Sequence, residues 1–270
     1  MELARSQPSL GEDNLRQLED MRQSLEQHRS SGLTPKNWAL VRTILQSDVW
    51  PEVLRLPRRL MAEANSDRHT MPVRSAVQAQ IAVAIRILSV APVRMQNLGS
   101  IIIGTNLVRP GGHGTPYTLT FPEYDVKNRV TLEFPLDPTT TEFIDCYVHD
   151  HRPVLMGGRN HDFLFPGEAH ERKDIKTLSA QISDKLWKCL GLKITPHQFR
   201  HAAAAILLRH EPGNYEQVRR VLGHRNIQTT NSFYIGLETL EATRRFADLV
   251  TDLEKRSDTC SQRGRAEHRR

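Results

Sequence analysis

The sequence predicts a mainly α-helical domain that contains a small antiparallel β-sheet, an α+β fold. Apolar residues recur at helical spacing in several stretches, most clearly in residues 76–88. Three short segments rich in β-branched and aromatic residues follow between residues 101 and 134. Helical patterns then resume and continue to about residue 253. The chain has 270 residues, of which 38% are apolar, which is enough for one large domain or for a domain with a small second one.

Residues 1–70 predict a helical N-terminal segment. Three helices are expected in it, over residues 12–29, 34–46 and 51–64. The pair Thr34-Pro35 suits a helix start, with threonine as the cap and proline in the first position. Pro57 is expected to interrupt the third helix. The polar stretch 66–72 then predicts a boundary before a second domain over residues 71–254.

The middle of the chain predicts the sheet. The expected strands are residues 101–103, 117–121 and 130–134. A glycine-rich segment, residues 111–114, separates the first two strands, and residues 125–129 form the turn between the second and the third. Strands joined by such short connections favour an antiparallel meander inside a helical domain.

The C-terminal half predicts more helices. They are expected near residues 138–149, 177–190, 196–210, 215–222 and 238–253. Thr195 and Pro196 suit the start of the helix that begins there. The last helix carries an apolar stripe suited to packing within the chain or against a second copy, made of Leu240, Phe246, Val250 and Leu253. Residues 255–270 are short, polar and basic, and we expect a disordered tail.

Composition limits the class of protein. The net charge is +6 and the pI is about 9.4, which favours an anionic partner but is common among soluble proteins. Cys146, Cys189 and Cys260 lie far apart and form no CxxC pair, which argues against a disulfide framework and fits a reducing cytoplasm. No run approaches 18 apolar residues and the N-terminus is polar, so we expect neither a membrane span nor a secretion signal.

The most informative residues lie between positions 195 and 234. His197, Arg200, His224 and Tyr234 occur there at intervals that suit a metal-independent site for breaking a phosphodiester. A guanidinium holds two phosphate oxygens at once. An imidazole donates a hydrogen bond or carries a proton near neutral pH. A phenol can attack phosphorus and form a covalent intermediate.

This stretch resembles the tyrosine recombinases, also called phage-type integrases. His197-Gln-Phe-Arg200 matches the family's His-x-x-Arg motif, and Leu222-Gly223-His224 matches its Leu-Gly-His motif, followed by Tyr234. Upstream, Arg94 in the segment 91–98 matches the family's first arginine, which usually follows a long apolar helix. The resemblance spans about residues 74–250 and implies the recombinase catalytic fold. The order and the intervals of the motifs together make it specific.

The resemblance implies a role for each site residue. The implied catalytic set is Arg94, Lys127, His197, Arg200, His224 and Tyr234. Tyr234 is the implied nucleophile, and the two arginines and His224 would stabilise charge on the phosphate. His197 would donate to an oxygen or help to deprotonate the tyrosine. Lys127, in the expected hairpin turn, would protonate the leaving 5′ oxygen, with Lys173 and Lys176 as the fallback candidates.

Three features depart from the family pattern. Tyr234 follows His224 by ten residues where nine is commonest, and Phe233 occupies the usual place. Asn97 stands where the family often has an acidic residue. Only about 70 residues precede the catalytic pattern, where family members usually carry a helical core-binding domain, so we expect a shortened or truncated version of that domain and weak site-specific binding.

The implied partner is double-stranded DNA, with self-association in a tetrameric synapse, and the implied location is the cytoplasm, at the nucleoid. No cofactor or metal is expected, because the phosphotyrosine bond retains the phosphodiester energy. Three alternatives remain: a DNA-binding remnant without recombination activity, a type IB topoisomerase, or a zinc hydrolase. Topoisomerases of that group usually lack a histidine at the position of His197. His197 and His201 mimic a zinc motif, but Gln198 stands where its general-base glutamate belongs.

Overall fold

The computed structural model divides the chain into two compact units, residues 1–32 and residues 33–270. It describes residues 12–27, 33–44, 49–168, 172–228, 230–231, 234, 242–243 and 245–255. The described part of the first unit is helix α2 (Glu12–Gln27). The second unit begins at Leu33, because the helices between Leu33 and residue 70 pack against the rest of this unit.

Three helices open the large unit: α3 (Pro35–Ile44), α4 (Val49–Asp67) and α5 (Pro72–Val90). The expected interruption at Pro57 is wrong, since α4 runs through it. Proline removes one backbone hydrogen bond from a helix. Leu56, Pro57 and Leu60 are all buried in the α4–α5 packing, and this burial offsets that loss.

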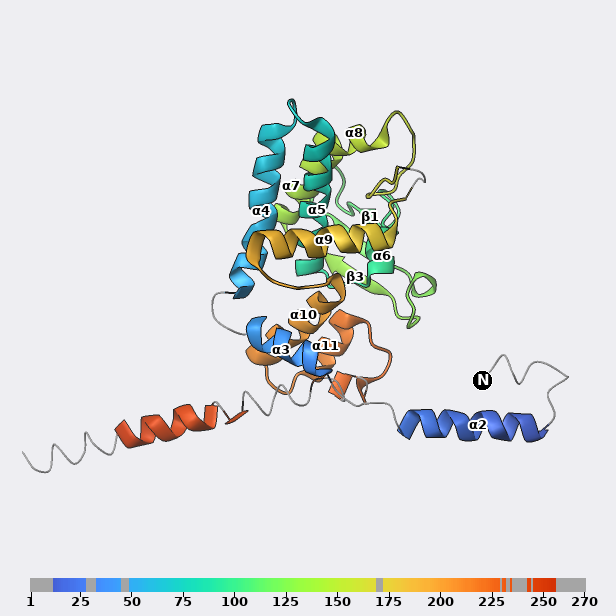
Figure 1. The fold of residues 1–270 in the computed structure, drawn as a ribbon, viewed down its shortest axis with the longest axis vertical. Coiled ribbons are helices and arrows are strands. Elements are labelled where there is room, and N and C mark those ends of the chain that lie inside the picture. The colour runs from blue at the N-terminus through green and yellow to red at the C-terminus, as the bar shows by residue number, and fades with distance from the viewer. Residues whose placement is uncertain are drawn as a thin grey trace, which may run out of the picture. The chain divides into compact units, whose positions relative to one another are not determined.

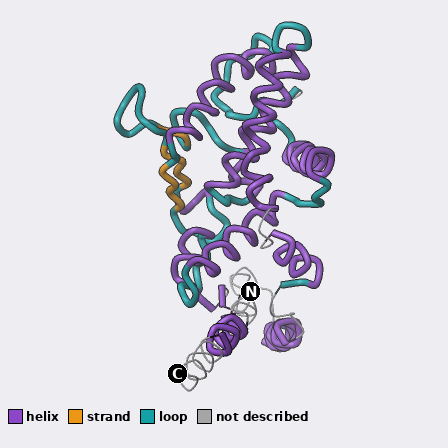
Figure 2. The backbone as a smooth tube through the Cα atoms, turned by 90° about the vertical axis from the view of Figure 1, so that its left-hand side faces the viewer, coloured by secondary structure: helices purple, strands orange, loops and turns teal. Residues whose placement is uncertain are grey.

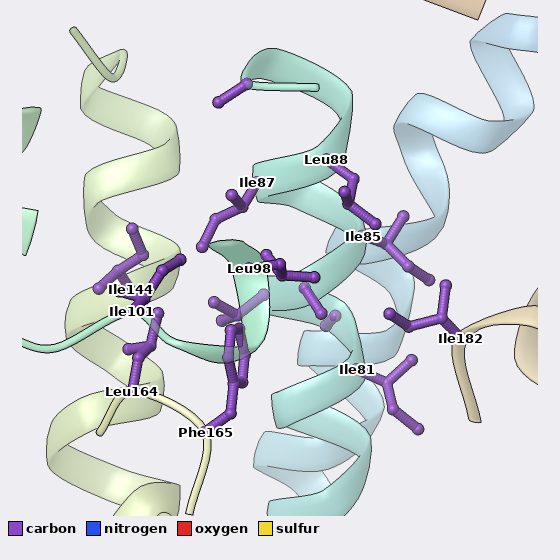
Figure 3. Packing of buried hydrophobic residues seen from close by; sticks show 14 of the residues in the cluster. Ile81, Ile85, Ile87, Leu88, Leu98, Ile101, Ile144, Leu164, Phe165 and Ile182 are labelled. Atoms are coloured by element: carbon purple, nitrogen blue, oxygen red, sulfur yellow. The ribbon is translucent and has the colours of Figure 1, made fainter. Parts of the chain in front are cut away.

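Helix α5 is the centre of the main core. Figure 3 shows its residues Ile81, Ile85 and Leu88 among side chains from several other elements, including Phe165 and Ile182. By length and composition alone α5 could cross a membrane, but 61% of its most apolar window is buried inside the protein. That burial is what a core helix of a globular domain shows.

The small sheet follows a short helix, α6 (Met95–Gly99). Its strands are β1 (Leu107–Val108), β2 (Thr118–Phe121) and β3 (Leu132–Pro135), antiparallel in the order β1-β2-β3. The register pairs Leu107 with Leu119, and Leu119 with Phe134. The strands lie to one side of the helices (Figure 2).

The first expected strand, residues 101–103, is wrong. Ile102 and Ile103 form only isolated bridges, with Phe163 and Leu107 respectively, and the first strand of the sheet is β1. Ile101 is fully buried, so its apolar character reflects the core and not a position in the sheet. Between β2 and β3 lies a short 3-10 turn, η1 (Glu123–Asp125), and then the loop that carries Lys127.

Four helical elements follow the sheet: α7 (Pro138–Cys146), the π-helical turn η2 (Tyr147–His151), α8 (Arg152–Met156) and α9 (Ile175–Leu190). The single helix expected over residues 138–149 therefore continues, through a π-helical turn, into a further helix. Asp137 begins α7 by accepting the Thr140 N–H, and Arg86 of α5 pairs with the same carboxylate at 2.9 Å.

Helices α10 (Pro196–His210) and α11 (Tyr215–Leu222) match the expected ranges and lie together with α3 (Figure 1). A second, smaller core joins them, made of Leu33, Val41, Ala204, Ala205, Leu208, Val218, Leu222 and Tyr234. Residues 245–255 are helical. Phe246 and Leu253 of the expected apolar stripe are 68% and 55% exposed, while Leu240 lies outside the described residues.

Candidate active site

Arg200, on α10, ties together two segments that lie far apart in the sequence. Its Nη1 donates to the carbonyl oxygen of Pro92 at 2.7 Å, and its Nη2 donates to that of Leu222 at 2.6 Å. The residue is 3% exposed, and burial, followed by the charge of Arg94, lowers its pKa to about 10. A guanidinium has five N–H donors, so donors remain for another ligand while Arg200 holds both loops.

Arg94 precedes α6 in the first of these loops. Its Nη1 is buried, and no residue in the described part of the chain accepts a hydrogen bond from it. Burial lowers its pKa. A buried guanidinium nitrogen without an acceptor is costly, and an anion would remove that cost. The charge of Arg94 also lowers the pKa values of His197, Arg200 and His224, which places the four groups in one cluster.

His224 joins this cluster from the loop after α11. Its Nδ1 lies 3.0 Å from the Thr230 hydroxyl, so Nε2 is the nitrogen left for a ligand. The Arg219 carbonyl oxygen accepts the His224 N–H at 2.9 Å and fixes the backbone. Burial, and then the charges of Arg200, Arg94 and Arg219, lower the pKa of His224 to about 4.

The Lys127 turn is fastened to the same loop. Lys127 itself is exposed, but the Asn128 side chain donates to the Gly223 carbonyl oxygen at 2.7 Å. Asn97 of α6, 3% exposed, donates to the Asp125 carbonyl oxygen at 3.0 Å. The amide that replaces the family's acidic residue therefore anchors the turn on its other side.

Replacing Gly223 with alanine is expected to destabilise the fold and displace His224. Gly223 has φ of 59°, and a Cβ there would meet Leu132 at 2.5 Å. We expect a loss of about 2–5 kcal/mol from the left-handed backbone and the overpacking together. Gly191→Ala is the matched control, because φ is 67° and nothing lies within 4 Å of its Cβ. It should lose only about 1–2 kcal/mol in the same denaturation experiment; equal losses would show that Leu132 accommodates the methyl group.

His197 and His201 occupy one face of α10, one turn apart. Their rings meet edge to face, with centroids 5.1 Å apart. His197 is the more exposed residue, and partial burial of its ring and then the charges of Arg200 and Arg94 lower its pKa. His201 is 6% exposed, and burial, followed by the charges of its neighbours, lowers its pKa to about 4.

Tyr234 contacts His201 and not His197. Its hydroxyl oxygen lies 3.0 Å from His201 Nδ1, and the residue is 2% exposed in the smaller core. Burial raises the pKa of Tyr234, and the charge of Arg200 acts in the opposite direction. Phe233, which occupies the commoner position for a nucleophile, lies outside the described residues.

The free energy of unfolding should fall in mild acid because His201 is buried in its neutral form. The folded-state pKa of His201, about 4, lies below the ordinary value of 6.5, so the unfolded chain binds more protons between those values. The neutral His201 ring stabilises the folded state fully above pH 6.5. As the pH falls toward 4, about 3 kcal/mol of this stabilisation is lost. Urea unfolding from pH 7.5 to pH 5 measures this. His201→Asn should flatten the dependence, and an equally steep dependence in this variant would show that other groups cause it.

The structure brings together Arg94, His197, Arg200 and His224, with Tyr234 reaching the group through His201. It ties the Lys127 turn to them, while Lys173 lies just before α9 and Lys176 lies in its first turn. Sequence reasoning missed Asn37, whose amide contacts His201 Nε2 at 3.2 Å. Since both ring nitrogens of His201 are engaged, neither is left for the zinc site considered above. The helical spacing between His197 and His201 could have indicated that His201 lies at the site. No sequence pattern indicated Asn37.

Comparisons with known proteins identify the family of this chain. The model of the phage integrase family matches residues 57–240. Tyrosine recombinase XerD of Pseudomonas aeruginosa is 32% identical over 100 residues, 37% of this chain and 33% of the relative. XerD of Pseudomonas putida is 30% identical over 101 residues, with the same shares. The matched stretch thus spans about a third of the length of these curated relatives.

One solved structure supports the fold. The XerH site-specific recombinase bound to palindromic difH substrate, a post-cleavage complex, superposes with a TM-score of 0.52 and 15% identity. The match covers 83% of this chain and 54% of that one. Because the family model covers more than half of the residues, the chain belongs to the phage integrase family.

Proposed function

We propose that this chain is a site-specific tyrosine recombinase that cleaves and rejoins DNA strands. The observation that carries the proposal is the buried Nη1 of Arg94, which no described residue pairs, within a cationic cluster beside a tyrosine. Such a cluster suits a phosphodiester, because guanidinium groups bind phosphate oxygens two at a time. No carboxylate of the described chain is among the groups that shift the pKa values of Arg94, Arg200, His197 or His224.

In the proposed reaction, the Tyr234 oxygen attacks the scissile phosphorus and the bond from phosphorus to the 5′ oxygen breaks. Tyr234 gives up its proton, and Lys127 gives a proton to the leaving 5′ oxygen. The products are a 3′-phosphotyrosine and a free 5′ hydroxyl. A 5′ hydroxyl of a partner strand then attacks the adduct and releases Tyr234. Each step exchanges one phosphoester bond for another, so the sequence of steps balances without a cofactor.

Arg94, Arg200 and His224 are assigned to the charge that builds up on the phosphate. Arg94 offers its unpaired Nη1, and Arg200 offers the donors that its two carbonyl contacts leave over. His224 presents Nε2, because Thr230 holds Nδ1. Donors placed in advance act most strongly on charge that develops in the transition state.

Tyr234 must become accessible to the phosphate for this chemistry. At 2% exposure its hydroxyl lies within the smaller core, out of reach of a phosphate on a DNA surface. Binding of DNA therefore has to give a phosphate access to the Tyr234 oxygen beside His201 of α10. The exposed Lys127 turn needs no comparable change.

We propose double-stranded DNA as the partner and a tetramer on DNA as the working assembly, at the nucleoid. The XerH relative was solved with its difH substrate, and the net charge of this chain is +6. Contacts with phosphates make affinity fall steeply with salt. Light scattering of the chain with and without a DNA duplex at low salt tests self-association.

Capture of a covalent adduct tests the proposed function. The purified chain is incubated with fragmented DNA from its source, denatured, and the DNA that remains attached to protein is sequenced. An adduct enriched in one sequence supports a site-specific recombinase. Adducts spread over unrelated sequences, with only the original strand rejoined, would favour a type IB topoisomerase. Salt-sensitive binding without any adduct would favour a DNA-binding remnant.

A further inference from the structure

A chain of hydrogen bonds leads from a backbone group to the hydroxyl of Tyr234. It begins at the N–H of Thr195, which can only donate and lies 2.8 Å from Gln198 Oε1. This contact fixes the orientation of the Gln198 amide. Gln198 Nε2 then donates to Asn37 Oδ1 at 3.1 Å, which fixes the Asn37 amide in turn. Asn37 Nδ2 is thereby directed at His201 Nε2, at 3.2 Å.

The tautomer of His201 follows from this chain of contacts. Asn37 Nδ2 donates, so His201 Nε2 must accept and carries no hydrogen. The imidazole is neutral near pH 7, because burial, with His197, Arg200 and His224 as the other groups acting on it, lowers its pKa to about 4. Its one hydrogen is therefore on Nδ1, which lies 3.0 Å from the Tyr234 oxygen. His201 is the donor in that contact, and the phenol oxygen accepts.

We propose that His201 is a catalytic residue that stabilises the phenolate form of Tyr234 by donating Nδ1–H to its oxygen, in a tautomer set by Asn37 of α3. This inference rests on the proposed recombinase function. Stabilisation of the phenolate opposes the cost of ionising a buried phenol, so attack on phosphorus becomes easier. His201 is not the base, because the nitrogen that faces the phenol already carries a hydrogen.

The proton of the phenol must then go to another acceptor. His197 is the neighbouring imidazole of α10, its ring edge to face with that of His201 at 5.1 Å, and it is exposed. The O–H bond of Tyr234 breaks, its electron pair stays on oxygen, and the proton passes to His197 or to water. His201 keeps its own hydrogen throughout and changes neither charge nor tautomer.

Nitrogen-15 NMR of the histidine rings tests the tautomer without DNA. The chain is labelled with 15N-histidine, and the His201 signals are assigned as those missing from His201→Asn. We expect Nδ1 to have the shift of a protonated nitrogen and Nε2 that of an unprotonated one at pH 7.5. The opposite pattern, or two protonated nitrogens, overturns the proposal.

Asn37→Asp tests the role of α3 in the same spectra. A carboxylate of equal size can only accept, so it should draw the hydrogen to Nε2 and leave Nδ1 bare. The tautomer should switch and the rate of adduct formation should fall by a factor of about ten or more. Asn160→Asp, a matched charge change at an exposed position, should alter neither. An unchanged tautomer in Asn37→Asp would overturn the assignment of α3.

A matched pair of substitutions distinguishes a donor from a base. The side-chain amide of His201→Asn can place an N–H near the position of Nδ1, whereas His201→Asp places a carboxylate there, which can accept a proton but not donate. We expect His201→Asn to form the adduct within about tenfold of the unmodified chain, and His201→Asp to fall by about 10² or more. The reverse order, or equal rates in both variants, would contradict a donor.

The two proposals fail in different ways. No adduct from the unmodified chain counts against the recombinase function, whereas the NMR tautomer is read without DNA. If either variant unfolds in a thermal melt, the spectra of the unmodified chain still decide between donor and acceptor.

Discussion

Tyr234→Phe is expected to reduce formation of the covalent DNA adduct to background. Phenylalanine lacks the oxygen that forms the bond to phosphorus, and no other tyrosine lies between His224 and the end of the chain. The substitution should also lower the free energy of unfolding by about 1–3 kcal/mol, because the buried Nδ1 of His201 loses its hydrogen-bond partner. Denaturing gels with labelled duplex measure the first effect, and urea unfolding the second.

Tyr147→Phe is the matched control for that experiment. Tyr147 is fully buried in the main core, and its hydroxyl accepts a hydrogen bond from Gln80 Nε2 at 3.2 Å. It should show a comparable loss of stability with no loss of adduct at a temperature where both variants are folded. An adduct that persists in Tyr234→Phe would mean that another residue is the nucleophile.

Arg94→Met should slow adduct formation by a factor of about 10² to 10³ without destabilising the protein. The rate should fall because a donor for the phosphate is lost. Stability should stay the same or rise, because the Nη1 of Arg94 has no acceptor in the described part of the chain and the variant removes a half-buried positive charge. Single-turnover kinetics on a nicked duplex and a thermal melt give the two results.

Arg152→Met provides the contrast. Arg152 donates to the carbonyl oxygens of Phe163 at 2.9 Å and His161 at 2.5 Å, so it holds a loop of the protein together. Its loss should lower the melting temperature and leave the chemistry of folded molecules intact. If Arg94→Met behaves like Arg152→Met and is destabilised but still reactive, Arg94 is a structural residue.

Local patterns in the sequence predicted the elements that carry the site. Thr195 and Pro196 predicted the start of α10, and the structure adds Gln198, which accepts the Thr195 N–H. The helix expected over residues 196–210 contains both His197 and Arg200, and the helix expected over residues 215–222 is α11. These features depend on residues close in sequence, so propensity and capping are enough to predict them.

Contacts between distant segments could not be predicted from the sequence. The bonds from Arg200 to Pro92 and Leu222 depend on how α5, α10 and α11 pack, and no local pattern encodes them. Asn37 and His201 lie 164 residues apart. The two wrong predictions, the interruption at Pro57 and the strand at residues 101–103, also depend on tertiary burial. Burial keeps α4 helical through Pro57, and the apolar residues 101–103 are explained by burial and not by a place in the sheet.

The position of α3 limits how this protein can be shortened. The family match begins at residue 57, downstream of Leu33, Asn37 and Val41. A fragment trimmed to residues 57–240 would lose these residues and uncover the apolar side of α10 that they cover. It would also leave His201 Nε2 facing solvent, where either tautomer is equally free to form. Shortened versions of this protein, and fusions that carry this domain, should therefore begin at or before Leu33.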